Sequence, residues 1–407
     1  MNCRGCGTCL SLPLIDLGTA PPSNAYLRAD QLAAAEAWVP LKVAVCEQCW
    51  LVQTEDYTRA ETLFDADYAY FSSYSSSWLA HARDYVGQMV ERFGLNGESR
   101  VVEIAANDGY LLQYVAERGI PCLGVEPTRS TAQAAREKGL QIREVFFGEQ
   151  AARDLASEGW SADLMAANNV LAHVPDINDF LRGFATLLKA DGVATFEFPH
   201  LLRLMAEQQF DTLYHEHYSY LSLTAVNTLC ARNGLVIFDV SELPTHGGSL
   251  RVFVQRADGP RPRQASVDDL LGIEARVGVS TAAFYSTLAP AAQRIKHQLL
   301  RFLLQAKAEG KRVVGYGAAA KGNTLFNYAG VKPDLLAWVA DANPHKQGKF
   351  LPGSRIPVVA PERLAIERPD YVLVLPWNLL KEVSEQQAHI RKWGGRFVIA
   401  VPELTVL

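Results

Sequence analysis

The sequence predicts an α/β protein built from three domains. Its 407 residues exceed what one hydrophobic core usually serves, so more than one domain is expected. Five of the seven cysteines lie in the first 49 residues, and alternating strand and helix patterns begin at Arg100 and again at Lys311. We therefore expect a small cysteine-rich domain over residues 1–66, an α/β domain over 67–258 and a smaller α/β domain over 259–407.

Composition and charge narrow the class of protein. The formal net charge of −5 argues against a general surface for nucleic acid or anionic membranes. The apolar runs are too short and interrupted to cross a bilayer, and the N-terminus lacks the apolar core of a signal peptide. We expect a cytoplasmic protein without a nucleic-acid or membrane partner, and leave its oligomeric state open, a monomer included.

Two cysteine pairs indicate a metal site in the N-terminal domain. Cys3 and Cys6 form one Cys-x-x-Cys pair, and Cys46 and Cys49 form a second. In a reducing compartment, two such pairs are better explained by a tetrahedral Zn²⁺ than by disulfides. Four thiolates close the coordination shell, so we expect a structural zinc. Cys9 also has Cys-x-x-Cys spacing from Cys6 and is left as a substitute ligand.

A hydroxyl-rich segment precedes the first helix of the middle domain. Residues 72–77 hold five serines and a tyrosine, and the apolar spacing from Trp78 to Phe93 predicts an amphipathic helix. A serine-rich run before a helix is most often a capping turn or a linker, and we expect that here.

The middle domain shows a repeated strand-and-helix pattern. A strand starting at Arg100 runs into a tight turn, and a helix is expected over 110–117. Further strands are expected over residues 121–127, 161–169 and 193–198. This alternation predicts a parallel sheet that binds ligands at the carboxyl ends of its strands. Glu126, which closes the second strand, is suited to accept hydrogen bonds from a ribose diol.

The expected ligand of this sheet is a nucleoside without a phosphate chain. The segment lacks Gly-x-Gly-x-x-Gly and a lysine that would cradle phosphate, so S-adenosylmethionine fits better than a dinucleotide. Strands over 235–240 and 249–254 follow as an antiparallel pair, which is how the sheets of class I methyltransferases end. His246 lies in the Gly-rich loop between them and either faces a ligand or is solvated, as loop histidines more often are.

The C-terminal domain begins its sheet with an anion-binding pattern. Residues 311–324 predict a strand, a Gly-x-Gly-x-x-Ala turn and a helix start. Backbone amides of such a turn bind anions, and Lys321 adds positive charge. We expect a nucleotide diphosphate here, with Tyr316 in the turn as a further substrate contact. A strand ending at Asp341 keeps a dinucleotide open, and the cations of residues 341–349 belong to the site or to a solvated loop.

One short stretch gathers most of the candidate acid–base chemistry. From Tyr214 to Tyr218, five consecutive side chains can exchange or share a proton. Two histidines that flank a carboxylate can supply a base whose tautomer is set by a neighbour. The same His-x-His spacing can bind a metal, and aromatic-rich segments are often half-buried structure. The stretch alone leaves catalysis, a metal site and a structural role open.

Taken together, the motifs resemble those of three-domain, zinc-containing nucleotide-sugar C-methyltransferases, over essentially the whole chain. Besides the two cysteine pairs they are Tyr-x-Tyr-Phe-Ser-Ser-Tyr-Ser, Glu-Ile-Ala-Ala-Asn-Asp-Gly-Tyr-Leu-Leu, Asn-Asn-Val-Leu-Ala-His-Val-Pro-Asp, Tyr-His-Glu-His-Tyr, His-Gly-Gly-Ser-Leu-Arg and Gly-Tyr-Gly-Ala-Ala-Ala-Lys-Gly-Asn-Thr. The resemblance implies a zinc-binding N-terminal domain, a class I methyltransferase (Rossmann-like) middle domain and a smaller Rossmann-like C-terminal domain. It implies S-adenosylmethionine as methyl donor and a thymidine diphosphate (dTDP) 4-keto-deoxysugar of antibiotic or polysaccharide biosynthesis as substrate, methylated at C3.

The resemblance also implies roles for individual residues. The expected catalytic residues are His217, Tyr214, Glu216, Tyr68 and His173. His217 is the expected base, which removes a proton beside the ketone so that carbon can attack the methyl group. Tyr214 and Tyr68 are expected to donate protons or stabilise the enolate, and Glu216 and His173 to orient the base. The expected cofactor residues are Asn107, Asp108, Glu126 and Asn168, and Lys321 is expected near the diphosphate.

Several alternatives stay open at this point. Methylation at C5 or on a different nucleotide 4-keto-sugar is the nearest, and the stereochemical outcome is undetermined. A nicotinamide-dependent oxidoreductase and a non-catalytic sugar-nucleotide-binding protein are alternatives of another class. In the turn after the first strand, Ala105 and Ala106 replace the glycine or serine common in related sequences, and we expect an ordinary backbone conformation for alanine there.

Overall fold

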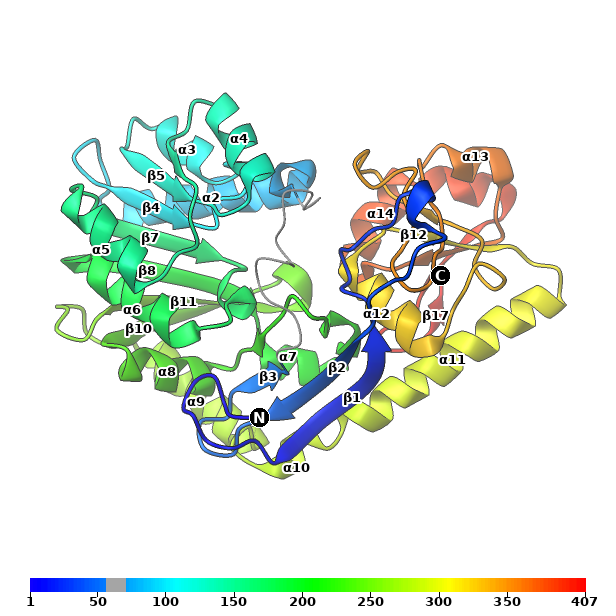
Figure 1. Cartoon of the computed structure of the whole chain (residues 1–407), viewed down its shortest axis with the longest axis horizontal. Coiled ribbons are helices and arrows are strands. Elements are labelled where there is room, and N and C mark those ends of the chain that lie inside the picture. The colour runs from blue at the N-terminus through cyan, green and yellow to red at the C-terminus, as the bar shows by residue number, and fades with distance from the viewer. Residues whose placement is uncertain (56–70) are drawn as a thin grey trace.

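Three sheets organise the chain in the computed structural model, which describes residues 1–55 and 71–407 (Figure 1). The N-terminal sheet has the order β1-β2-β3-β9 and is antiparallel throughout. Its strands are β1 Leu12–Ala20, β2 Val39–Val45, β3 Val52–Thr54 and β9 Ser219–Tyr220. The fourth strand therefore comes from far along the chain, directly after the Tyr214–Tyr218 stretch.

The middle sheet has seven strands in the order β10-β11-β8-β7-β4-β5-β6. They are β4 Val101–Ile104, β5 Cys122–Val125, β6 Ile142–Arg143, β7 Ala162–Asn168, β8 Leu188–Pro199, β10 Leu235–Leu243 and β11 Ser249–Arg256. Strands β4 to β8 pair in parallel, whereas β11 is antiparallel to both β8 and β10. This arrangement confirms the predicted parallel sheet with an antiparallel closing pair.

Helices and short 3-10 turns connect these strands. The helices are α2 Ser76–Phe93, α3 Leu112–Ala116, α4 Arg129–Glu137, α5 Glu149–Ser157, α6 Ile177–Leu187, α7 Leu201–Ala206 and α8 Leu223–Arg232. The 3-10 turns are η1 Ala29–Gln31, η2 Ser72–Tyr74, η3 Leu171–His173, η4 Phe210–Thr212 and η5 Thr245–Gly247. The Ser75 hydroxyl accepts a hydrogen bond from the Trp78 N–H at 3.3 Å, so the serine-rich run caps α2 as predicted.

The C-terminal sheet has the order β14-β13-β12-β15-β16-β17, parallel except for β17. Its strands are β12 Val313–Tyr316, β13 Val339–Ala340, β14 Val358–Val359, β15 Tyr371–Val374, β16 Arg396–Ile399 and β17 Thr405–Val406. Its helical elements are α12 Ala320–Ala329, α13 Arg363–Glu367, η6 Trp377–Leu379, α14 Leu380–Gln386 and η7 Ala388–Trp393. The predicted Gly-x-Gly turn is present, because a Cβ at Gly317 would lie 2.4 Å from Pro376 Cδ at a φ of +83°.

Three helices link the middle and C-terminal sheets. They are α9 Ala265–Val277, α10 Ala282–Tyr285 and α11 Leu288–Ala308. Helix α9 packs on β10 and α8, whereas α11 packs on β1 and α12. Figure 1 shows α11 (yellow) running beside the N-terminal sheet (blue) towards the C-terminal domain. The domain boundaries at 66/67 and 258/259 stay predictions.

The N-terminal sheet shares a hydrophobic core with the C-terminal domain. Its buried Leu14 and Leu41 belong to the same cluster as Leu299 of α11 and Phe326 of α12. The cysteine end of the N-terminal domain instead joins the core of the middle sheet. The small domain therefore bridges the two larger ones, and non-directional apolar burial holds all three together. No helix among the described residues is long and apolar enough to cross a membrane.

Candidate active site

The four predicted zinc ligands converge at the start of the chain. The Sγ atoms of Cys3, Cys6, Cys46 and Cys49 all lie within 4.8 Å of one another. The sulfur atoms of Cys3 and Cys49 are 3.5 Å apart and those of Cys6 and Cys46 are 3.4 Å apart. Thiolates at about 2.3 Å from a tetrahedral zinc stand about 3.8 Å apart, so the donor set fits Zn²⁺. Cys9 is exposed and outside this group, which leaves the predicted four as the ligands.

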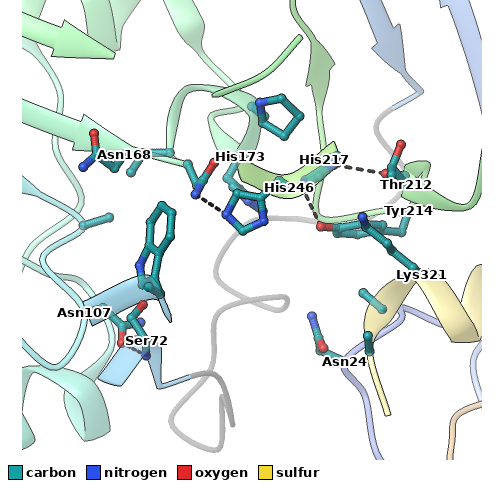
Figure 2. Close-up of a pocket in the computed structure, with 18 of the residues that line it drawn as sticks. Asn24, Ser72, Asn107, Asn168, His173, Thr212, Tyr214, His217, His246 and Lys321 are labelled. Carbon is teal, nitrogen blue, oxygen red and sulfur yellow. Dashed lines mark hydrogen bonds between the residues drawn. The ribbon is translucent and has the colours of Figure 1, made fainter. Parts of the chain in front are cut away.

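A cavity of about 360 Å³ lies where the three domains meet (Figure 2). One side is formed by residues at the carboxyl ends of β4, β5 and β7, and the other by the start of α12 and the turn at η6. The N-terminal domain contributes Asn24. The predicted site residues that line this cavity are Asn107, Glu126, Asn168, His173, Tyr214, His217, His246 and Lys321.

The turn after β4 is held in an uncommon backbone conformation. Ala105 has a φ of 54° and Asn107 a φ of 50°, so the expected ordinary conformation for Ala105 is wrong. A non-glycine residue at positive φ stores strain that the surrounding packing must sustain. Ala106 is packed against Gly124 of β5, where a Cβ would lie 2.7 Å from the Ala106 methyl carbon. Strained backbone next to a cavity is typical of a ligand-binding turn.

The carboxylate of Glu126 is fixed at the mouth of this turn. Its oxygens accept hydrogen bonds from the backbone N–H groups of Asn107 and Thr128, both at 2.9 Å. Burial raises the pKa of Glu126 above its ordinary value, although these hydrogen bonds oppose the shift. Each oxygen keeps a further lone pair, so the side chain can still accept from a ribose diol.

Unpaired polar atoms mark the rest of the cofactor side. Within the described residues, neither side-chain atom of Asn168 has a hydrogen-bond partner, and Asn169 Oδ1, which also belongs to the cavity lining, lacks one as well. Buried polar groups without partners cost about 1–3 kcal/mol each, which indicates a polar ligand between them. The donor set of one acidic residue and side-chain amides fits S-adenosylmethionine.

The base candidate has a defined tautomer. His217 Nδ1 lies 3.1 Å from the backbone carbonyl of Thr212, which can only accept, so Nδ1 carries the proton. Nε2 is 2.7 Å from the Tyr214 hydroxyl, which donates to its lone pair. The two rings are 4.0 Å apart between centroids. His217 therefore presents a basic nitrogen to the cavity together with a phenol that can share a proton with it.

Burial keeps this imidazole neutral. Desolvation and then the neighbouring His173 place the pKa of His217 well below its ordinary value. The two rings are 4.6 Å apart in an edge-to-face arrangement, and His173 Nδ1 donates to the Glu216 carbonyl at 2.8 Å. The unprotonated form, which a base requires, is therefore the form present near neutral pH.

All three domains hold the Tyr214–Tyr218 stretch in place. The hydroxyl of Thr54 in β3 donates to the His217 carbonyl at 3.1 Å, and His215 Nε2 lies 3.2 Å from the Pro40 carbonyl in β2. From the C-terminal domain, the Thr324 hydroxyl donates to the Leu213 carbonyl at 2.8 Å. His215 and His217 thus face different surroundings, so these two rings do not converge on one metal ion.

Glu216 connects the stretch to the N-terminal domain. The carboxyl group accepts from the Asn24 backbone N–H at 3.2 Å and from the Asn24 side-chain amide at 3.0 Å. It is 1% exposed, and burial raises the pKa of Glu216 to about 7 against these two hydrogen bonds. Glu216 therefore positions Asn24 beside the base and does not bond to the His217 ring itself.

Lys321 projects from the first turn of α12 into the cavity (Figure 2). Nζ donates to Asn378 Oδ1 at 2.9 Å and lies 4.2 Å from the ring centre of Trp377. Burial lowers the pKa of Lys321 to about 8, opposed by the charge of Asp211. Asp211 in turn accepts from Trp377 Nε1 at 2.8 Å. This cluster places the ammonium group of Lys321, which can lose its proton near pH 8, in the same cavity as the base.

His246 lies on the wall between the two halves of the cavity. It has a φ of 55°, and its Nε2 accepts from the Asn169 side-chain amide at 2.9 Å. Burial lowers the pKa of His246 to about 4, so the ring is neutral. In Figure 2 it stands between Asn168 and the His217–Tyr214 pair. The loop histidine is thus cavity-lining, against the more frequent solvated case.

Three predicted residues that the structure describes do not line the cavity, namely Asp108, Glu216 and Tyr316. Tyr68 lies outside the described residues. Tyr316 is buried in the C-terminal core and its hydroxyl accepts from Gln387 at 3.2 Å, and Asp108 sits behind the turn, where it accepts from the Ser73 N–H at 3.3 Å. Asp341, at the end of the strand that kept a dinucleotide open, accepts hydrogen bonds from the backbone N–H groups of Ala318 and Asn343 and does not line the cavity.

Several cavity residues were missed at the sequence level. They include Asn24, Trp78, Asn169, Thr212 and Asn378. Asn24 follows two prolines in a segment without periodicity, and nothing in that segment indicates a site. Asn169 stands next to the predicted Asn168 at the end of β7, so the strand-end rule could have included it.

Three family models match successive parts of the chain. A zinc binding domain matches residues 3–64, a methyltransferase domain 78–240 and a C-methyltransferase C-terminal domain 244–402. The chain is 34% identical over 406 residues to C-methyltransferase NovU of Streptomyces niveus, covering 100% of this chain and 96% of that protein. It is 30% identical over 115 residues to a ubiquinone biosynthesis O-methyltransferase of Alkalilimnicola ehrlichii, covering 28% of this chain and 45% of that protein.

Solved structures resemble parts of the chain. Magnesium protoporphyrin IX methyltransferase of Synechocystis is 16% identical with a TM-score of 0.34, covering 44% of this chain and 79% of that one. The zinc binding domain model covers the four-cysteine cluster, and the methyltransferase domain model covers most of the seven-stranded sheet. The chain belongs to the S-adenosylmethionine-dependent C-methyltransferases that carry an N-terminal zinc-binding domain.

Proposed function

We propose that the chain methylates the C3 carbon beside the ketone of a dTDP-4-keto-deoxysugar. The observation that carries the proposal is the hydrogen-bonded His217–Tyr214 pair, held in one cavity between the cofactor residues and the cation Lys321. A neutral base next to a phenol suits removal of a proton beside a carbonyl, and the cation suits an anionic nucleotide substrate. The C-methyltransferase relative supports transfer to carbon.

The proposed reaction begins at the base. His217 Nε2 takes the proton from the carbon beside the ketone, and the Tyr214 hydroxyl redirects its hydrogen bond to the enolate oxygen. S-adenosylmethionine would be held by Asn107, Glu126 and Asn168 and would supply an electrophilic methyl group, whose bond to the sulfonium sulfur would break as the new bond to the sugar carbon forms and leave the thioether S-adenosylhomocysteine. The proton taken from the sugar stays on His217 until it leaves to solvent. Burial around the pair excludes water that would reprotonate the enolate.

The remaining residues are assigned by their contacts. His173 orients the peptide of Glu216, and Glu216 holds Asn24 at the cavity. We assign Lys321 to the diphosphate and His246 to the sugar, and the role of Tyr68 stays a prediction. The cytoplasmic location is also still a prediction.

Mass spectrometry tests the proposed substrate. Purified protein is incubated with S-adenosylmethionine and a freshly generated dTDP-2,6-dideoxy-4-keto-hexose. We expect a product heavier by one methylene, with NMR placing the methyl group on C3. A methyl group on C5 would show that the proposed position of methylation is wrong. A methylated product formed only from a sugar carried by another nucleotide would show that the proposed nucleotide is wrong. No transfer with any 4-keto-sugar, although the protein binds S-adenosylmethionine, would overturn the proposal.

A further inference from the structure

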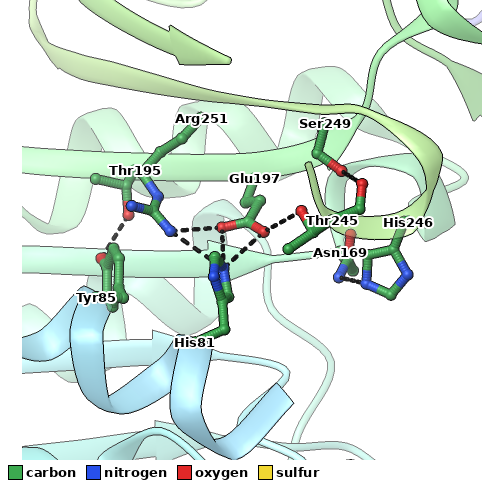
Figure 3. A network of polar contacts seen from close by, with 9 residues as sticks. All are labelled: His81, Tyr85, Asn169, Thr195, Glu197, Thr245, His246, Ser249 and Arg251. Carbon is green, nitrogen blue, oxygen red and sulfur yellow. Dashed lines mark hydrogen bonds and ion pairs between the residues drawn. The ribbon is translucent and has the colours of Figure 1, made fainter. Parts of the chain in front are cut away.

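A buried carboxylate in the middle sheet lies outside the roles assigned so far. Glu197 lies near the end of β8, and its side chain is 0% exposed. Both oxygens are 2.9 Å from His81 Nε2, and one accepts from the Arg251 guanidinium at 2.7 Å. The other accepts from the Thr245 hydroxyl at 3.1 Å, as Figure 3 shows. One carboxylate thus joins α2, β11 and η5.

Glu197 is ionised in this network. Burial by itself would raise the pKa of Glu197, but the His81 hydrogen bond and the Arg251 charge outweigh it and place the pKa below its ordinary value. Arg251 is 3% exposed and stacks over the Tyr85 ring at 4.6 Å. A buried ion pair is weak evidence for stability, because desolvation offsets much of its attraction. The contacts of Glu197 with several elements indicate a role other than stability.

Both branches of the network end at a cavity wall. Through His81, Glu197 supports Trp78, since the two rings are stacked 4.9 Å apart at 24°. Through Thr245, it supports η5 and the positive-φ residue His246. Trp78 and His246 both line the cavity, and their rings are 5.0 Å apart. The Glu197 carboxylate therefore supports the contact between Trp78 of α2 and His246 of η5.

We propose that Glu197 is a positioning residue, which fixes Trp78 and His246 at the junction between the methyl-donor side and the sugar side of the cavity. The expected effect of Glu197 on the rate of methyl transfer to the sugar rests on the proposed function. Methyl transfer requires donor and acceptor at near-contact distance, and a misplacement of about 1 Å can cost on the order of 10²-fold in rate. A wall held by one buried carboxylate meets that requirement without touching either ligand.

The chain offers a matched control. Glu274 is also 0% exposed and also pairs with a buried histidine, His200, at 2.7 Å. It accepts further hydrogen bonds from the hydroxyl and N–H of Thr224, but none of these partners lines the cavity. A purely structural role predicts similar consequences for Glu197→Gln and Glu274→Gln, whereas positioning predicts that only Glu197→Gln affects the site.

The first experiment observes the site without a sugar substrate. Imidazole ¹H–¹⁵N correlation spectra are recorded for protein labelled at its nine histidines and saturated with S-adenosylhomocysteine, and His246→Gln assigns the relevant signals. We expect Glu197→Gln and Thr245→Val to shift the His246 signals, Thr245→Ser to restore them, and Glu274→Gln to leave them in place. Unchanged His246 signals in a folded Glu197→Gln protein would overturn the proposal.

The second experiment measures rate. With the 4-keto-sugar substrate, we expect Glu197→Gln to lower kcat about 10- to 100-fold while S-adenosylhomocysteine affinity changes less than about threefold. In a His246→Ala background the same change should lower kcat by less than about threefold, because the residue acts partly through His246. If the double variant lowers kcat by the product of the two single effects, Glu197 does not act through His246. If the variants shift the His246 signals as expected but wild-type protein transfers no methyl group to the 4-keto-sugar, only the proposed substrate would be refuted.

Discussion

The buried carboxyl of Glu216 makes the stability of the fold depend on pH in an unusual direction. Burial raises the pKa of Glu216 from 4.5 to about 7 in the folded protein. Between these values the folded state binds a proton that the unfolded state has lost, so rising pH destabilises the fold. The stabilisation is complete below pH 4.5 and is lost as the pH rises through 7.

The size of the effect follows from the shift. A difference of 2.5 pKa units corresponds to about 3 kcal/mol at about 1.36 kcal/mol per unit, and about 2 kcal/mol of it falls between pH 5.5 and 8. Glutamine has the shape of the protonated acid and does not titrate. We therefore expect Glu216→Gln to be more stable than wild type at both pH values, and its advantage to grow by about 2 kcal/mol from pH 5.5 to pH 8.

Urea unfolding at several pH values measures this difference. Glu274→Gln is the control of opposite sign, because the His200 hydrogen bond outweighs burial and lowers the pKa of Glu274. That variant should lose stability relative to wild type at neutral pH. A gap between Glu216→Gln and wild type that stays constant from pH 5.5 to 8 would refute the reasoning.

Three further predictions concern the ligands. Glu126→Gln should weaken S-adenosylhomocysteine binding about 10- to 100-fold by calorimetry, since hydrogen bonds to a charged group are worth about 1.5–3 kcal/mol; unchanged affinity would remove Glu126 from the cofactor site. Cys46→Ser should lower bound zinc and the unfolding midpoint, while Cys9→Ser should retain wild-type zinc by metal analysis; equal loss in both would contradict the four-cysteine assignment. Lys321→Gln should raise KM for the dTDP-sugar at least about tenfold without changing cofactor affinity, and an unchanged KM would place the diphosphate elsewhere.

Periodicity and strand-end rules predicted most of the fold. The strand ending at Glu126 and the strand ending at Asn168 both reach the cavity, because carboxyl ends of parallel strands share one edge of a sheet. The zinc ligands could also be predicted from the sequence, because two Cys-x-x-Cys pairs have the spacing that zinc-binding cysteines use.

Residues that reach the site through tertiary contacts could not be predicted in this way. Asn24 bonds to Glu216 across 192 positions, and its own segment carries no pattern. The positive φ of Ala105 depends on close packing with β5 and not on the propensity of alanine. Tyr316 lies in the predicted turn, yet the alternation of the strand directs its side chain into the core.

Exchange of the sugar proton tests the central claim most directly. The 4-keto-sugar is incubated in deuterium oxide with the protein and S-adenosylhomocysteine, which blocks methyl transfer, and NMR follows the hydrogen on C3. We predict that wild-type protein exchanges this hydrogen and that His217→Asn, with unchanged S-adenosylhomocysteine affinity, does not. Exchange by His217→Asn at the wild-type rate would contradict His217 as the base.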